Sequence, residues 1–217
     1  MKIKWLGHSC FVITSDKGAK VMTDPYKKDT LGYSRPAEKV DAVTVSHDHY
    51  DHYDPGFIAS LPGKPQVIKN SKGGKAGDIS IKGLDVWHDE NKGKQRGPNV
   101  IFSFDVDGVN VCHLGDLGHQ LSSSEINALG KVDVLLIPIG GVFTIDYKGA
   151  GTLCEAIKPR IVMPMHFKTA ACSWLEFTAE DFIKDKKSVS KTGKTEIELD
   201  AERLPSEMQV VVLDYVA

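Results

Sequence analysis

A run of six residues, His47-Asp48-His49-Tyr50-Asp51-His52, constrains this chain more than any other feature of its sequence. The run directly follows residues 41–46, DAVTVS, a β-branched segment that is typical of a buried strand. The 217 residues include only 8 histidines, so chance would produce the spacing H-x-H-x-D-H in about one such chain in a thousand. The fold must therefore place a strand end where three imidazoles and a carboxylate meet.

The spacing of this run has a direct physical meaning. Side chains at positions i and i+2 of an extended segment point the same way, so His47 and His49 are spaced to bind one metal ion. A turn after them carries Asp51 and His52 toward a second metal position. The alternative is a polar loop with solvated histidines, but four such groups within six residues favour a metal site. Imidazole and carboxylate together suit Zn²⁺, with Mn²⁺ and Fe²⁺ as the other candidates.

Further candidate ligands also follow predicted strands. His166 comes directly after the apolar residues 160–165, and His88 ends the short apolar stretch 84–87. His113 closes the predicted strand 109–113, and Asp116 lies in the turn after it. Sites in layered α/β folds collect at strand ends, so we expect these residues to complete the site. Spacing alone leaves both His88 and His113 open as the third ligand of the first metal.

Strands and helices alternate along the chain. Strands are predicted around residues 3–5 and 11–13, and over residues 20–23, 41–46, 99–104, 109–113, 132–138, 160–165 and 208–213. Capping signals predict helices that begin at Asp54-Pro55 and at Ser122, and two more are predicted over residues 150–157 and 178–185. Residues 69–78 and 184–194 are predicted as loops. This order indicates an α/β fold in which helices cover the sheets.

Composition narrows the class of protein. There are 27 Lys and Arg residues and 29 Asp and Glu residues, for a net charge of −2, so no strong positive field attracts nucleic acid or an anionic membrane surface. No apolar run approaches the roughly 20 residues of a membrane span. The start MKIKWLGHSC has no signal-peptide core. We therefore expect a cytoplasmic protein without membrane association, and the length suits one domain.

The four cysteines, Cys10, Cys112, Cys154 and Cys172, contain no C-x-x-C pair. This absence argues against a zinc ribbon and against a thioredoxin-type redox site. Three of them lie in apolar or helical patterns, so we expect buried free thiols, as is usual in a reducing compartment.

Several segments together resemble a known superfamily. They are LGHSCFVI, TDPY, the run His47-x-His49-x-Asp51-His52, His88, VCHLGDLGH with Asp116, LLIPIGG, and MPMHFKT with His166. The metal-ligand pattern looks like that of the metallo-β-lactamase superfamily. The other segments resemble stand-alone metal-dependent hydrolases of that superfamily, relatives of the L-ascorbate-6-phosphate lactonase. The resemblance covers residues 1 to about 215 and implies a single metallo-β-lactamase-like domain over residues 1–217, with a four-layer αββα sandwich.

The resemblance also implies which residues bind each metal. It assigns His47, His49 and His88 to the first metal, assigns Asp51, His52 and His166 to the second, and makes Asp116 the bridge between them. It favours His88 over His113, because in the family's Gly-Asp turn the aspartate is the ligand and the preceding histidine is not.

Four other residues have polar side chains for which the sequence predicts a position outside the ligand set. Asp24, in the turn TDP, resembles a carboxylate that orients a metal-binding histidine from behind. Its alternative is an ordinary turn before Pro25. We expect His8 and His119 to be surface or core histidines, with a position beside the cleft as the alternative. We expect Lys168 to be solvated.

The implied activity is hydrolysis with two divalent metal ions, with zinc first and manganese or iron as alternatives. A metal-bridging hydroxide would attack a small ester, lactone or phosphoester, with Asp51 and Asp116 as the catalytic carboxylates that position it and relay a proton. The alternatives are a phosphodiesterase or nuclease acting on RNA or nucleotides, a di-iron redox protein, and a non-enzymatic metal-binding module.

Three observations disfavour these alternatives. The net charge of −2 disfavours RNA, and 217 residues leave no room for the flavin domain that di-iron relatives usually carry. Seven candidate ligands for two metals leave coordination positions for water, which favours catalysis over simple metal storage. The expected partner is therefore a small-molecule substrate, with no nucleic acid, and no oligomeric state is predicted.

Overall fold

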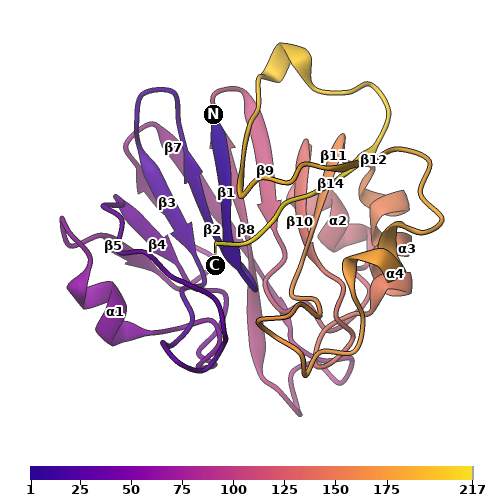
Figure 1. Cartoon of the computed structure of the whole chain (residues 1–217), viewed down its shortest axis with the longest axis horizontal. Coiled ribbons are helices and arrows are strands. Elements are labelled where there is room, and N and C mark those ends of the chain that lie inside the picture. The colour runs from indigo at the N-terminus through magenta and orange to yellow at the C-terminus, as the bar shows by residue number, and fades with distance from the viewer. Residues whose placement is uncertain (217) are drawn as a thin grey trace.

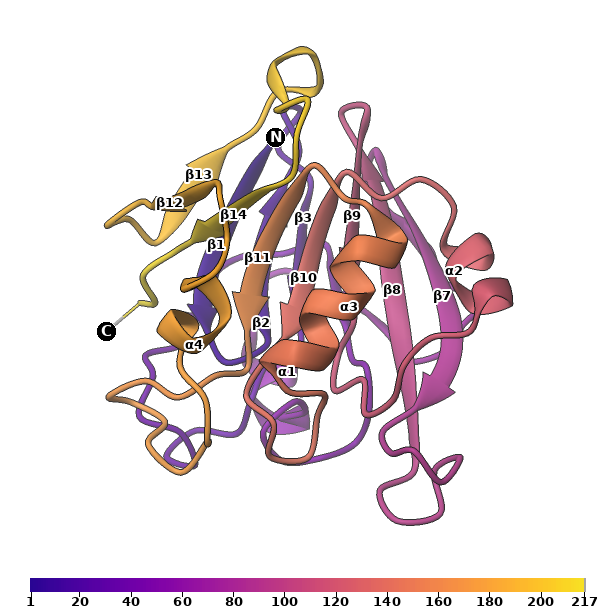
Figure 2. The same cartoon turned by 90° about the vertical axis from the view of Figure 1, so that its right-hand side faces the viewer.

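Two mixed β-sheets face each other in the computed structural model, which describes residues 1–216 (Figure 1). Helix α1 (Pro55–Ser60) lies on the outer side of the six-stranded sheet. Helices α2 (Ser123–Leu129), α3 (Tyr147–Ile157) and α4 (Ala179–Ile183) lie on the outer side of the eight-stranded sheet (Figure 2). This order of layers confirms the predicted α/β sandwich.

The six-stranded sheet has the order β13-β1-β2-β3-β4-β5. Its strands are β1 (Lys2–Gly7), β2 (Cys10–Thr14), β3 (Lys20–Thr23), β4 (Ala42–Thr44), β5 (Gln66–Ile68) and β13 (Glu196–Glu198). β2 is antiparallel to both β1 and β3, and β3 is parallel to β4. Consequently β1, β3 and β4 run in the same direction and end at the same edge of the sheet.

The eight-stranded sheet has the order β12-β14-β11-β10-β9-β8-β7-β6. Its strands are β6 (Gly74–Ala76), β7 (Ile79–Trp87), β8 (Pro98–Val106), β9 (Val109–His113), β10 (Val134–Pro138), β11 (Ile161–Met165), β12 (Val189–Lys191) and β14 (Gln209–Val212). β8 is antiparallel to both β7 and β9, whereas β9, β10 and β11 are parallel. The strands β7, β9, β10 and β11 therefore also end at one edge.

Two helices begin at the capping side chains that the sequence predicts. The Asp54 side chain accepts a hydrogen bond from the Phe57 N–H, and Ser122 forms a capping box with Glu125. α3 begins three residues before the predicted 150, because the Asp146 carboxylate caps it by accepting from the Gly149 N–H. Within residues 1–216, none of the helices is long and apolar enough to cross a membrane.

Some short strands were not predicted. β6 lies inside the predicted loop 69–78, and β12 lies inside the predicted loop 184–194. Their sequences, GKA and VSK, carry no hydrophobic alternation, because each strand forms by pairing its backbone with one neighbour, β7 or β14. The apolar stretch 84–87 likewise proves to be only the end of the nine-residue strand β7.

The core has two parts because β2 buries both of its faces. Phe11 and Ile13 join a large cluster that includes Phe102 and other side chains of the eight-stranded sheet. Cys10 and Val12 point to the opposite face and join a smaller cluster with side chains of β3, β4 and α1. The two packed faces hold β2 and its neighbours rigidly, and so fix where their ends lie.

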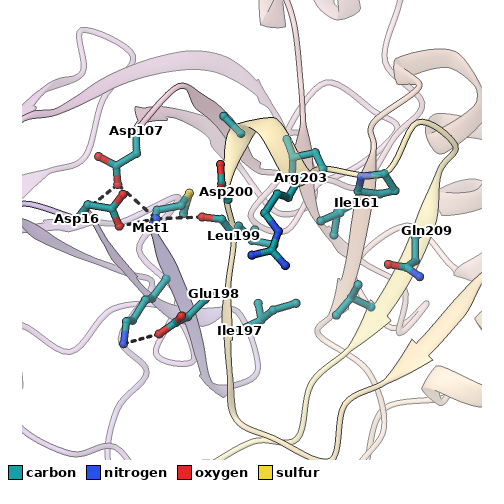
Figure 3. A pocket seen from close by; sticks show the side chains of 15 residues that line it. Met1, Asp16, Asp107, Ile161, Ile197, Glu198, Leu199, Asp200, Arg203 and Gln209 are labelled. Carbon is teal, nitrogen blue, oxygen red and sulfur yellow. Dashed lines mark hydrogen bonds and ion pairs between the residues drawn. The ribbon is translucent and has the colours of Figure 1, made fainter.

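A cavity of about 530 Å³ lies near the beginning of β1, at the other end of the strands from His47–His52. Figure 3 shows the Met1 amino group, which forms ion pairs with Asp16 (2.8 Å) and Asp107 (3.5 Å) beside this cavity. The cavity has no histidine in its lining. It therefore lacks the imidazole ligands that the sequence analysis associates with function.

The reactivity of the four cysteine thiols depends on the packing of this core. All four are buried and free within the described chain, and burial raises the pKa of Cys112, Cys154 and Cys172 to about 12 each. Thiolates are the reactive form, so we expect Ellman's reagent at pH 8 to label none of them rapidly in the folded protein. All four should react in denaturant. Rapid labelling of a thiol in the native protein would show that this packing is wrong.

Candidate metal centre

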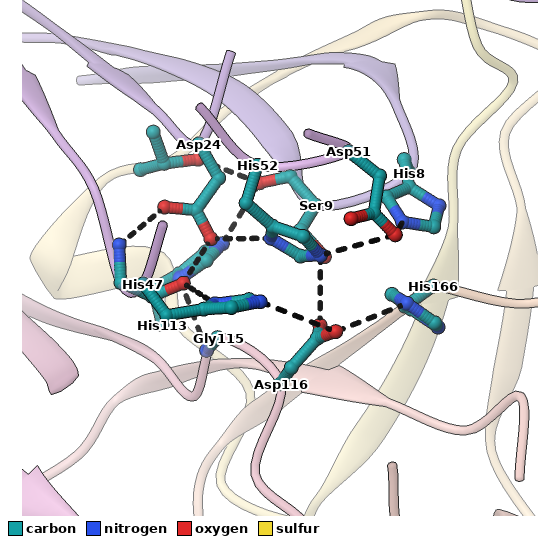
Figure 4. A network of polar contacts seen from close by, with 12 residues as sticks. His8, Ser9, Asp24, His47, Asp51, His52, His113, Gly115, Asp116 and His166 are labelled. Atoms are coloured by element: carbon teal, nitrogen blue, oxygen red, sulfur yellow. Dashed lines mark hydrogen bonds and ion pairs between the residues drawn. The ribbon is translucent and has the colours of Figure 1, made fainter. Parts of the chain in front are cut away.

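Strand ends bring the predicted ligands into one cluster, most of which Figure 4 shows. Each polar segment directly or closely follows a strand: His8 follows β1, Asp24 follows β3, residues 47–52 follow β4, His88 follows β7, Asp116 follows β9, and His166 follows β11. Within each sheet the strands that precede these segments end at one edge, and the two sheets face each other. Side chains from six places in the sequence therefore meet between the two sheet edges.

The backbone is turned sharply where three of these strands end. His8, Asp24 and His166 have φ values of 52°, 39° and 49°, in the left-handed region. This conformation costs an L-residue roughly 1–2 kcal/mol, and it is retained here where the side chain must enter the cluster. The His8 carbonyl oxygen accepts hydrogen bonds from the His166 N–H (3.3 Å) and from Trp5 Nε1 (3.0 Å). These bonds tie the end of β11 to the end of β1 across the two sheets.

The first donor group consists of His47, His49 and His88, whose ligand atoms lie within 4.8 Å of one another. His113, the competing candidate, lies elsewhere in the network. Its Nε2 faces the Ser9 carbonyl oxygen at 2.8 Å, and its Nδ1 accepts from the Gly115 N–H at 3.2 Å. Both ring nitrogens of His113 are therefore engaged by the backbone, which leaves His88 as the third member of this group.

The second donor group consists of Asp51, His52, His166 and one residue that was not predicted, His8. His8 is fully buried, and its Nε2 lies 3.4 Å from Asp51 Oδ2. Its ring centroid lies 4.0 Å from that of His166. The sequence predicted a surface or core position for His8, with a position beside the cleft as the alternative; the structure buries it and places it among the donors of the second group. Its position directly after the apolar strand β1 was the available signal, the same signal that identified His166.

Asp116 lies between the two donor groups. Its Oδ2 is 3.3 Å from His88 Nε2 and 3.8 Å from His47 Nε2, on the side of the first group. The same oxygen is 3.3 Å from His166 Nε2, and its Oδ1 is 3.1 Å from His52 Nε2, on the side of the second group. One carboxylate thus faces nitrogen donors of both groups.

A second carboxylate, Asp24, orients a ligand of each group from behind. Its Oδ2 accepts from His52 Nδ1 at 2.9 Å and from the Ser46 hydroxyl at 2.5 Å. Because the Ser46 hydrogen is used in that bond, the Ser46 oxygen accepts from His47 Nδ1 at 2.9 Å. Both histidines therefore carry their hydrogen on Nδ1 and present Nε2 to the cluster. Ser46 was not singled out from the sequence, because a serine before a histidine has no distinctive spacing.

Burial and charge set the protonation of the cluster. Burial, together with nearby His166, lowers the pKa of His8 to about 3, and burial with His52 lowers the pKa of His47 well below its usual value. Burial also acts on His52, but Asp116 and Asp24 raise its pKa well above the usual value. Burial alone would raise the pKa of Asp116, yet His166 and His52 hold it well below its normal range. The cluster thus combines an ionised carboxylate, neutral imidazoles at His8 and His47, and a His52 imidazole that its carboxylate neighbours hold in the protonated form.

The unpaired atoms of the cluster fit divalent metal ions. Several buried ring nitrogens form no hydrogen bond within the described chain: His47 Nε2, His52 Nε2, and both nitrogens of His8 and of His166. A buried polar atom without a partner costs about 1–3 kcal/mol, so a cluster of them calls for a compensating ligand. Converging imidazole and carboxylate donors match the preferences of zinc and its neighbours.

Two other predicted positions lie outside the donor groups. His119 is half-buried, with Nε2 accepting from the Trp87 N–H and Nδ1 facing the Gln120 carbonyl oxygen. Lys168 is exposed, as expected. Near the cluster, Trp174 is 42% exposed and its ring centroid lies 6.3 Å from that of His166.

An αββα sandwich with histidine and aspartate donors at its strand ends defines the metallo-β-lactamase fold class. A family model described as the β-lactamase superfamily domain matches residues 2–166. A UPF0173 metal-dependent hydrolase from Archaeoglobus fulgidus is 32% identical over 212 residues, which cover 85% of this chain and 90% of the relative. The chain therefore belongs to the β-lactamase superfamily and, within it, to the UPF0173 metal-dependent hydrolases.

Two further comparisons agree with this assignment. A UPF0173 protein from Pyrococcus furiosus is 32% identical over 209 residues, covering 85% of this chain and 90% of that protein. The crystal structure of a candidate Zn-dependent hydrolase of the metallo-β-lactamase superfamily from Thermotoga maritima is similar, with a TM-score of 0.80 and 32% identity. That match covers 98% of this chain and 97% of the other chain.

A substitution at Asp24 tests whether its carboxylate orients the candidate metal ligands. The change Asp24→Asn keeps the shape of the side chain but removes the acceptor that orients His52 and, through Ser46, His47. We expect metal affinity to fall by about 10- to 100-fold, the usual effect of losing such an outer partner. Competition with a chromogenic chelator measures the affinity.

Asp133→Asn is the matched control. Asp133 is also fully buried and accepts a hydrogen bond from the Asn110 N–H, but it lies at the start of β10, away from the cluster. Its replacement should leave metal affinity unchanged. Equal affinities for Asp24→Asn and the unmodified protein would show that Asp24 does not orient the ligands.

Proposed function

We propose that this protein is a hydrolase that uses two divalent cations, with zinc as the expected ion, to cleave a small ester, lactone or phosphoester. The first cation would be held by His47, His49 and His88, and the second by Asp51, His52 and His166, with Asp116 between them. The observation that carries this proposal is the presence of two donor groups that share one central carboxylate.

The residues around the proposed ions have distinct tasks. Divalent cations bound there would supply an activated water as nucleophile and would polarise the scissile C=O or P=O group. Burial raises the pKa of Asp51, but the His8 imidazole, whose Nε2 lies 3.4 Å from Asp51 Oδ2, and the charge of His52 hold it below its usual range. Asp51 and Asp116 are therefore ionised at neutral pH, and their carboxylate oxygens can accept a hydrogen bond from the attacking water and orient it.

The two donor groups differ in their access to solvent. His8, His52 and His166 are fully buried, whereas His49 is partly exposed. The substrate is therefore proposed to approach from the side of the first group, where His49 reaches the surface. The substrate is proposed to be a small molecule rather than RNA, because a net charge of −2 supplies no basic field for a polynucleotide.

Removal of the metals tests the proposed reaction. Protein purified without chelator should contain close to two metal ions per chain and should hydrolyse members of a panel of esters, lactones and phosphodiesters. Dialysis against a chelator should abolish this activity, and zinc, manganese or iron(II) should restore it. Metal analysis and steady-state kinetics on the same samples provide the measurement.

Substitution of the shared carboxylate refines this test. Asp116→Ala should reduce kcat by roughly a hundredfold or more, because the proposed carboxylate between the cations is lost. Asp185→Ala removes an exposed carboxylate just after α4 and should leave kcat unchanged. Full activity in metal-free protein, or cleavage of a tRNA precursor in preference to every small ester, would overturn the proposal.

A further inference from the structure

A cavity of about 250 Å³ opens beside the first donor group. His47 and His49 form part of its wall, and two cationic side chains, Lys69 and Arg96, form another part. Its size suits a small molecule or one end of a larger substrate. The cavity therefore connects the proposed metal centre to two cationic side chains, and whether each of them is already paired decides what the cavity can bind.

Arg96 belongs to the loop that follows His88. Figure 2 shows this loop as the connection between β7 and β8. The Asp89 carboxylate accepts four backbone N–H groups of this loop, from Asn91, Gly93, Gln95 and Arg96, at 2.7 to 3.0 Å. One of these bonds, 2.8 Å long, is from Arg96 itself. The loop is therefore pinned to the residue next to His88, and the position of Arg96 follows from that of the donor group.

The Arg96 guanidinium is fixed but electrostatically uncompensated. Its central carbon lies 3.6 Å from the centroid of the Phe143 ring, which stacks against one face of the group. Stacking leaves the in-plane N–H donors free. Within residues 1–216 no carboxylate forms an ion pair with Arg96, whereas Lys69 is paired with Asp48 and lies 4.0 Å from the centroid of the Tyr53 ring.

We propose that Arg96 is a specificity residue that binds an oxyanion of the substrate, a carboxylate or a phosphate group, in this cavity. A planar guanidinium with free in-plane donors matches such a group in a bidentate manner. Asp48, the carboxylate in the cavity wall, is already neutralised by Lys69. The inference rests on the proposed function and narrows it: the substrate carries a negative charge beside the bond that is cleaved.

Binding of non-hydrolysable probes tests this inference without requiring turnover. Phenylphosphonate and benzoate present the two oxyanions, and benzamide is a neutral analogue of similar size. Their dissociation constants are measured by calorimetry with metal-loaded protein whose metal content has been determined. In Arg96→Gln we expect the dissociation constant of at least one oxyanion to rise by about tenfold or more. The dissociation constant of benzamide should not change. The oxyanion that is affected identifies the charged group of the substrate.

Two further variants control the binding experiment. Lys94→Gln removes a positive charge from an exposed position in the same loop and should leave all three dissociation constants unchanged. Arg96→Lys retains the positive charge but not the planar guanidinium with its paired N–H donors. Its affinity for the oxyanion should therefore lie between those of Arg96→Gln and the unmodified protein. Unchanged affinity of both oxyanions in Arg96→Gln, at normal metal content, overturns the inference. An equal loss in Lys94→Gln also overturns it, because the effect would then be one of net charge.

Kinetics separates this inference from the proposed function. Between two esters that differ only in a carboxylate near the scissile bond, Arg96→Gln should raise KM for the charged ester and leave KM for the neutral ester unchanged. One outcome is that the protein shows no hydrolysis while Arg96→Gln still weakens oxyanion binding. In that case the proposed hydrolysis is wrong and the proposed subsite is supported. If hydrolysis is metal-dependent but neither oxyanion binding nor KM changes in Arg96→Gln, only the proposed subsite is wrong.

Discussion

The buried carboxylate of Asp116 is the interaction on which the rest of this structure depends. An ionised carboxylate removed from water costs several kcal/mol unless positive or polar groups surround it. Here imidazole nitrogens of His52, His88 and His166 lie within 3.1–3.3 Å of it, and they come from three different strand ends. The same arrangement leaves several ring nitrogens without partners. The fold thus sustains a polar cluster whose unpaired donors match the preferences of divalent cations.

The two sheets supply the rigidity that such a cluster needs. Packed faces on both sides of β2, and the parallel strands β9, β10 and β11, determine where each strand ends. The left-handed conformations at His8, Asp24 and His166 concentrate backbone strain at these ends, and the surrounding core offsets its cost. Behind the cluster, Asp24 controls one ligand of each donor group, so the two proposed metal positions are linked by one hydrogen-bonded carboxylate as well as by Asp116.

Much of this arrangement could be predicted from sequence, because its signals are local. The run from His47 to His52, and His166 after an apolar strand, carry their chemistry within a few residues, and Asp54 and Ser122 mark helix starts by capping. For His8 the sequence left both a core position and a position beside the cleft open, because a lone histidine after a strand can be placed at a site only when the strand's direction is known. The strands β6 and β12 were missed because they depend on pairing with distant partners. Arg96 was not singled out because its position follows from the Asp89 loop and the distant Phe143 ring.

The location of bound metal tests the central claim most directly. Crystals grown with zinc allow anomalous diffraction at the zinc absorption edge to place each ion without reference to activity. The account predicts two anomalous peaks roughly 3.5–4 Å apart, one bounded by His47, His49 and His88 and the other by Asp51, His52 and His166, with Asp116 between them. A single peak, or peaks outside this ring of side chains, would contradict it.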